Sequence, residues 1–158
     1  VTAAYGDSVK VKDSDVMRDW IILILAAIGI VFSFIVFLVR GGLDLFRLVF
    51  KKDPSKTPKH LRIWTYVTSI AGVAVAVNFA LFFSALAVSD LSFLASWRFM
   101  TFAGLGLILA ICAVYPLLAK VGKGIGKGRL FLTVMTSLSA LAIVANILYW
   151  SLYQWWAL

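Results

Sequence analysis

The residue types that most often carry chemistry are scarce in this chain, and their spacing matches no catalytic or metal-binding motif. His60 is the single histidine and Cys112 the single cysteine. Zinc, iron and haem sites draw on several Cys, His or carboxylate ligands, so we predict no metal site and no cofactor. Cys112 lies in an apolar run with no base near it in sequence, which favours a small packing residue over a nucleophile. We therefore assign no catalytic residue.

The segment Lys120 to Arg129, with sequence KVGKGIGKGR, is rich in glycine and could be compared with a phosphate-binding loop. A P-loop, however, ends in Gly-Lys-Ser/Thr and follows a β-strand. This segment ends in Gly128-Arg129 and follows an apolar run, so a flexible basic linker is the better interpretation.

Two asparagines, Asn78 and Asn146, are the strongly polar residues inside long apolar runs. A hydrogen bond between them across two membrane helices would contribute roughly 0.5–2 kcal/mol. This structural role is the favoured interpretation, and a contact with a ligand is the alternative.

Four long apolar runs dominate the sequence, and the residues named so far lie within these runs or between them. The chain is 63% hydrophobic, against ~45–50% in soluble domains. Each run reaches the ~20 residues that a helix needs to cross a bilayer. We predict an all-α integral membrane protein with four transmembrane helices, at about 20–39, 63–89, 99–119 and 130–156. No Asp, Lys, Arg or His falls within these spans, which argues against a proton relay, an ion-coupled transporter or a voltage sensor.

Basic residues gather in two of the connections between these spans. Arg40 to Arg62 holds seven of the fifteen Lys and Arg residues, and Lys120 to Arg129 is a second basic segment. Short basic loops stay in the cytoplasm, so we expect both termini outside it and the helices packed as an antiparallel bundle. The net charge of +8 then indicates anionic lipid headgroups rather than nucleic acid as the partner. The residues expected at headgroups are Arg40, Arg47, Lys51, Lys52, Lys120, Lys123, Lys127 and Arg129.

The first basic connection has internal structure. We expect Arg40-Gly41-Gly42 to end the first span, and Leu43 to Lys52 to form a short helix lying in the cytoplasmic interface. Residues 1–19 are polar and are interpreted as an extracytoplasmic stub or linker before a transmembrane domain of residues 20–158. Because the chain begins with Val, it is expected to be processed, truncated or part of a longer protein.

Small residues recur every four positions along the second span, as Gly72, Ala76, Ala80 and Ser84. Such a stripe lets a neighbouring helix approach closely, where van der Waals contact drives association. The residues predicted to serve helix packing are Gly72, Ala76, Ala80, Ser84, Asn78 and Asn146. Gly29 and Ser33 form a similar pair in the first span.

The order of these features resembles the C-terminal transmembrane tail of bacterial serine hydrolases related to penicillin-binding proteins and β-lactamases. The features are Val39-Arg40, the loop Lys51 to Arg62, the third span running into Arg129, and the aromatic end at Tyr149-Trp150. The resemblance covers about 20–158 and implies a non-catalytic anchor for an upstream extracytoplasmic hydrolase in the bacterial cytoplasmic membrane. No Ser-x-x-Lys motif is present, so no active-site residue is transferred. The alternative is a small accessory subunit of a larger membrane complex.

Overall fold

The computed structural model describes residues 13–50, 58–87, 96–118 and 127–152, and these residues form four α-helices. The helices are α1 (Asp13–Val49), α2 (Lys59–Ala87), α3 (Ser96–Leu118) and α4 (Lys127–Tyr149). Each is long and apolar enough to cross a membrane. The predicted all-α class with four candidate membrane-spanning helices is therefore confirmed.

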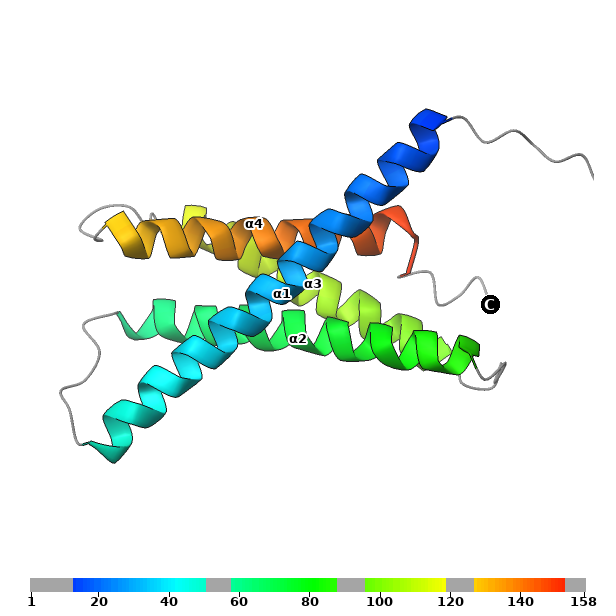
Figure 1. The fold of residues 1–158 in the computed structure, drawn as a ribbon. Coiled ribbons are helices and arrows are strands. Elements are labelled where there is room, and N and C mark those ends of the chain that lie inside the picture. The colour runs from blue at the N-terminus through cyan, green and yellow to red at the C-terminus, as the bar shows by residue number, and fades with distance from the viewer. Residues whose placement is uncertain (1–12, 51–57, 88–95, 119–126, 153–158) are drawn as a thin grey trace, which may run out of the picture.

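Helix α1 lies obliquely across the other three (Figure 1). It contacts α2 and α4, while α3 contacts the same two helices and α2 also contacts α4. In Figure 1 the chain passes back and forth, with α1 and α3 running in one direction and α2 and α4 in the other. At 37 residues, α1 is about 55 Å long, well beyond the ~30 Å hydrocarbon thickness of a bilayer. Its oblique path agrees with that excess length, because a long span tilts or emerges from the membrane.

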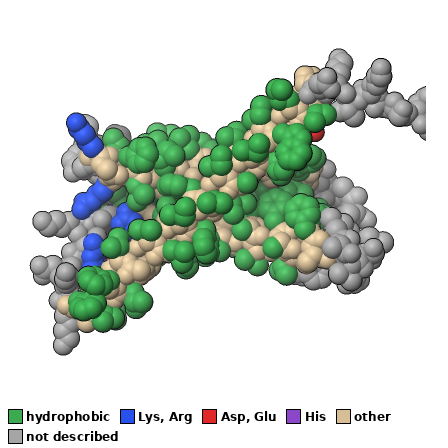
Figure 2. Space-filling view, in the orientation of Figure 1, with side chains coloured by type: hydrophobic (Ala, Val, Ile, Leu, Met, Phe, Trp, Pro, Cys, Tyr) green, Lys and Arg blue, Asp and Glu red, His purple; other side chains and the backbone are tan. Residues whose placement is uncertain are grey.

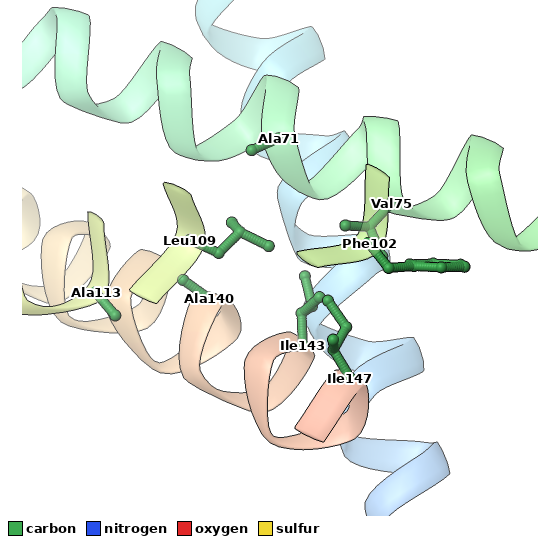
Figure 3. Packing of buried hydrophobic residues seen from close by; sticks show 8 residues of the cluster. All are labelled: Ala71, Val75, Phe102, Leu109, Ala113, Ala140, Ile143 and Ile147. Atoms are coloured by element: carbon green, nitrogen blue, oxygen red, sulfur yellow. The ribbon is translucent and has the colours of Figure 1, made fainter. Parts of the chain in front are cut away.

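The buried apolar cluster comes from α2, α3 and α4, and α1 adds only the partly buried Ile30 to its edge (Figure 3). Its fully buried members include Phe102 and Leu109 of α3 and Ile143 of α4. Most other large apolar side chains of the four helices are exposed. An apolar exterior around a small core is the arrangement expected of helices whose surroundings are lipid. The cluster comprises Ala71, Val75, Phe102, Leu109, Ala113, Ala140, Ile143 and Ile147.

Glycines let α1 approach two neighbours at close range. A Cβ atom added to Gly29 of α1 would lie 2.8 Å from the backbone oxygen of Ser139 in α4. One added to Gly72 of α2 would lie 2.7 Å from the Cβ of Ser33 in α1. Gly29 and Ser33, one turn apart, therefore belong to two different interfaces, and only glycine fits at either contact.

The first helix does not end at Arg40-Gly41-Gly42, and no separate interfacial helix follows it. Helix α1 instead continues without a break to Val49. Glycine in a helix interior costs only about 1 kcal/mol relative to alanine, so a pair of glycines weakens a helix without forbidding it. Beyond that pair, Asp44 accepts hydrogen bonds from Arg62 and Tyr66 of α2. The prediction was wrong because these contacts between helices outweigh the local helix-breaking tendency.

The helix bounds differ from the predicted spans mainly by extending into polar flanking residues. Helix α1 begins at Asp13, so residues 13–19 belong to it rather than to a separate linker, and residues 1–12 lie outside the described chain. Helix α4 ends at Tyr149 rather than near 156, and residues 153–158 are outside the described part. Ser151 has a left-handed φ of 52°, and the amide of Leu152 donates to the carbonyl of Ile147 at 3.0 Å. This is the Schellman motif, in which backbone amides just beyond the end of a helix donate to its last carbonyls.

Pro116 lies inside the last turn of α3. Proline has no backbone N–H, so the carbonyl four residues earlier, that of Cys112, loses its helical donor. The indole Nε1 of Trp64 in α2 donates to this carbonyl at 2.7 Å. The Trp64 ring also stacks on that of Tyr115 at 6.3 Å between centroids. Proline thus creates an acceptor in α3 that ties it to the beginning of α2.

Candidate functional site

An acidic residue, Asp44, organises a polar cluster between α1 and α2. Its carboxylate accepts from Nη2 of Arg62 at 2.9 Å and from the Tyr66 hydroxyl at 2.5 Å, and Arg47 lies 3.4 Å away. The side chain of Asp44 is only 16% exposed. Both carboxylate oxygens contact donors, Oδ1 through Arg47 and Oδ2 through Arg62 and Tyr66, so we call this cluster the Asp44 clasp. We did not predict this cluster from the sequence, although an acid within a basic segment is a signal for such pairing.

A second polar contact joins the beginning of α1 to the end of α4. Arg18 Nε donates to the Tyr149 hydroxyl at 2.7 Å, and that hydroxyl donates to Asp19. The Arg18 guanidinium also lies 5.4 Å from the centre of the Tyr149 ring. Arg18 is 57% exposed and Asp19 38%, so the contact marks a polar boundary of the bundle rather than an enclosed site.

The polar residues buried between the helices are mostly hydroxyls that bond to their own helix. Thr68 donates to the carbonyl of Trp64 at 2.8 Å, and Thr136 donates to that of Leu132 at 2.7 Å. Ser33, Thr65, Thr133 and Ser139 make the same bond four residues back. A hydroxyl satisfied in this way is a packing group rather than a free nucleophile.

The basic residues expected at lipid headgroups gather toward one end of the molecule as far as they are described. Figure 2 shows Lys and Arg side chains at the end where α1 finishes and α4 begins. Arg40 and Arg47 are half-buried, while Lys127 and Arg129 are exposed. Their chemistry suits phosphate groups, which accept bonds from guanidinium and ammonium donors. The expected headgroup residues Lys51, Lys52, Lys120 and Lys123 lie outside the described residues.

The small-residue stripe of α2 divides between buried and exposed positions. Gly72 is buried against α1, and Ala76 is half-buried. Ala80 and Ser84 are exposed, contrary to the predicted packing role within this bundle. Positions four apart on a helix drift by about 40° per step, so Ser84 is rotated about 120° from Gly72. The buried face of α2 instead passes through Val75 and Asn78.

Both predicted asparagines are buried, Asn78 at 3% and Asn146 at 2% exposure. Asn78 belongs to the buried face of α2. The Nδ2 of Asn146 has no hydrogen-bond partner among the described residues. Asn146 therefore does not donate to Asn78, and its amide remains an unused donor in an apolar setting.

Asn146 lines a cavity of about 680 Å³ between α1 and α2. The walls are otherwise aliphatic or aromatic and include Leu23 and Ile30 of α1 with Ala76 and Phe79 of α2. In Figure 1 the oblique α1 diverges from α2 towards its own N-terminal end. The volume falls within the ~300–1,000 Å³ of small-molecule sites, which are mostly apolar with a few fixed polar groups.

Neither the histidine nor the cysteine of this chain lines the cavity. His60 is exposed near the beginning of α2, and Cys112 is buried in α3. Within the described helices, no group of three or more His, Cys, Asp or Glu side chains could hold a metal ion. Among the candidate features, the cavity with Asn146 has the geometry of a binding site.

The chain matches no protein-family model, no curated protein and no solved structure.

Proposed function

We propose that this chain is a non-catalytic membrane-anchoring domain of an extracytoplasmic serine hydrolase in the bacterial cytoplasmic membrane. The described helices form an antiparallel bundle there, with both termini of the chain outside the cytoplasm. The observation that carries the anchoring role is the confinement of charge to the two ends of the helices. In α1 no charged residue occurs between Asp19 and Arg40, and in α2 none occurs after Arg62.

The interior of the bundle supports a structural rather than a transporting role. Conducting and proton-relaying membrane proteins use ionisable side chains within the spans. Here the described interior holds an apolar cluster, two asparagines and hydroxyls that mostly bond to their own helices. The hydrolase itself is inferred only from the resemblance of the sequence. We assign none of its active-site residues to this chain.

The orientation follows from the two basic connections. The Arg40–Arg62 segment carries seven Lys and Arg residues against one in the Asp90–Arg98 segment. Such an asymmetry places the basic side in the cytoplasm, where anionic headgroups attract it. The Asp44 clasp then lies at the cytoplasmic end, and the contact of Arg18 with Tyr149 lies at the outer end.

The test is to isolate the native polypeptide that contains this sequence from membranes and to treat it with a fluorophosphonate probe and a fluorescent penicillin. Anchoring of a hydrolase predicts a polypeptide much larger than 17.4 kDa that carries label at a serine outside this chain. A polypeptide of about this mass that stays unlabelled would overturn the proposal.

A second function is favoured by the exposure of Ala80 and Ser84 on α2. Exposed small residues at helical spacing suit close contact with a helix of another protein. The chain would then be an accessory subunit of a larger membrane complex. Co-purification of the unlabelled, short polypeptide with stoichiometric membrane partners would support this function over the first.

A further inference from the structure

The cavity between α1 and α2 opens on a surface that faces lipid rather than water. At its rim, Leu23 is 44% exposed, Val31 57% and Phe83 60%. These side chains belong to the apolar bands of two candidate membrane spans. Figure 2 shows this face, with apolar side chains along α1 and beside it. An occupant that enters from the side therefore comes from the hydrocarbon of the bilayer.

The polar requirement of the cavity is an acceptor for the amide nitrogen of Asn146. Asn146 Nδ2 is buried and has no partner among the described residues, although an unsatisfied buried donor costs about 1–3 kcal/mol. A water molecule needs two to four polar partners to be held in a cavity. The remaining lining is apolar apart from the indole of Trp150, so water is a poor occupant. A molecule with a long apolar body and one carbonyl satisfies both the walls and the amide.

The depth of Asn146 indicates where that carbonyl would lie. Asn146 precedes the last residue of α4, Tyr149, by three positions, or about 4.5 Å along the helix. Tyr149 itself contacts the charged side chains of Arg18 and Asp19, which mark the polar boundary. Tyr and Trp side chains are typical of this interfacial level. The amide is therefore just inside the boundary, at the level where the ester carbonyls of a membrane lipid meet its acyl chains.

We propose that this cavity binds one acyl chain of an ester-linked membrane lipid. The chain lies between α1 and α2 against Ala76 and Phe79, and the ester carbonyl accepts a hydrogen bond from Asn146 Nδ2. The site requires only that the four helices span a membrane. It does not depend on a hydrolase upstream or on which end of the bundle faces the cytoplasm.

The experiment compares two lipids that differ only in the carbonyl. The whole protein is reconstituted with a diester phospholipid and a diether phospholipid of equal chain length and headgroup. Lipid retained after detergent extraction is then counted by native mass spectrometry. We expect one retained diester molecule per chain, with a preference of about threefold to tenfold over the diether, the range of one hydrogen bond. Equal retention of the two lipids would overturn the carbonyl contact.

Three variants separate the site from general lipid adhesion. N146L should abolish the preference for the diester while leaving the chain folded, as judged by helical circular dichroism. A27F places a ring into the cavity from an exposed position of its wall and should prevent retention of either lipid. A145F adds the same ring at an exposed position of α4 outside the cavity and should change nothing. If N146L keeps the diester preference, or A27F keeps the bound lipid, the proposal is wrong.

If N146L does not fold, N146A provides the second arm. Alanine has no side-chain hydrogen-bond donor and is smaller than asparagine, so it adds no bulk to the cavity wall. This variant should lower the preference for the diester in the folded fraction. An unchanged preference there would contradict the proposal, as it would for N146L.

Discussion

The indole of Trp64 donates a hydrogen bond of 2.7 Å to the backbone carbonyl of Cys112. This is the carbonyl that Pro116 deprives of its helical donor, since proline at that position has no N–H. A tryptophan at the beginning of α2 thus satisfies a buried acceptor in α3. The contact joins two helices whose other buried contacts are mostly apolar.

Replacing Trp64 with phenylalanine should lower the free energy of unfolding by about 1–3 kcal/mol, because the carbonyl of Cys112 is then buried without a donor. In a Pro116→Ala background the restored backbone N–H supplies that donor. The same substitution should therefore cost at least about 1 kcal/mol less. The measurement is a double-mutant cycle by reversible unfolding in mixed micelles. Additive effects would show that the carbonyl is not what couples these residues.

Replacing Gly72 with alanine should destabilise the bundle by about 1–3 kcal/mol through overpacking. The new Cβ would meet Ser33 at 2.6–2.7 Å, so α1 and α2 must separate. Gly104→Ala is the matched control, because a Cβ there has nothing within 4 Å. It should be neutral or stabilising by up to ~1 kcal/mol from helix propensity. Equal melting of both variants in detergent would contradict the assigned interface.

Replacing Asp44 with alanine should loosen the last two turns of α1. The variant loses the bonds from Arg62 and Tyr66, each to a charged acceptor and worth about 1.5–3 kcal/mol. Amides of residues 43–49 should then exchange with solvent about 10–100-fold faster. Hydrogen exchange read by mass spectrometry gives this directly. The control is Arg18→Ala, at the other end of α1, which should leave the exchange of residues 43–49 unchanged. Protection of these amides equal to wild type in the Asp44 variant would contradict the clasp.

Single cysteines introduced in a Cys112→Ala background test the proposed orientation. A membrane-impermeant maleimide added to intact cells should label Ser8→Cys and Ser92→Cys, because both termini and the Asp90–Arg98 segment are proposed to lie outside. Ser55→Cys should react only after the membrane is permeabilised. Labelling of Ser55→Cys in intact cells would reverse the proposed topology.

The sequence by itself determined the number and type of the helices. Hydropathy over about 20 residues is a local property, so four spans could be counted without knowing any contact. It also identified Gly72, Gly29 and Ser33 as sites of close approach, because small size is visible in the residue itself. It did not determine how far each helix extends into its polar flanks.

Tertiary structure decided the features that depend on two helices at once. Helix α1 continues past Gly41-Gly42 because Asp44 accepts hydrogen bonds from side chains of α2. Local helix propensity does not include such contacts between helices. Ala80 is exposed while Asn78 is buried, because the face of α2 that packs inside the bundle passes through Val75 and Asn78. Asn146 lies at the wall of an open cavity, and its Nδ2 has no hydrogen-bond partner among the described residues. A hydrophobic pattern limits which helices can form, but the angle between two helices follows from side chains that meet only when both are in place.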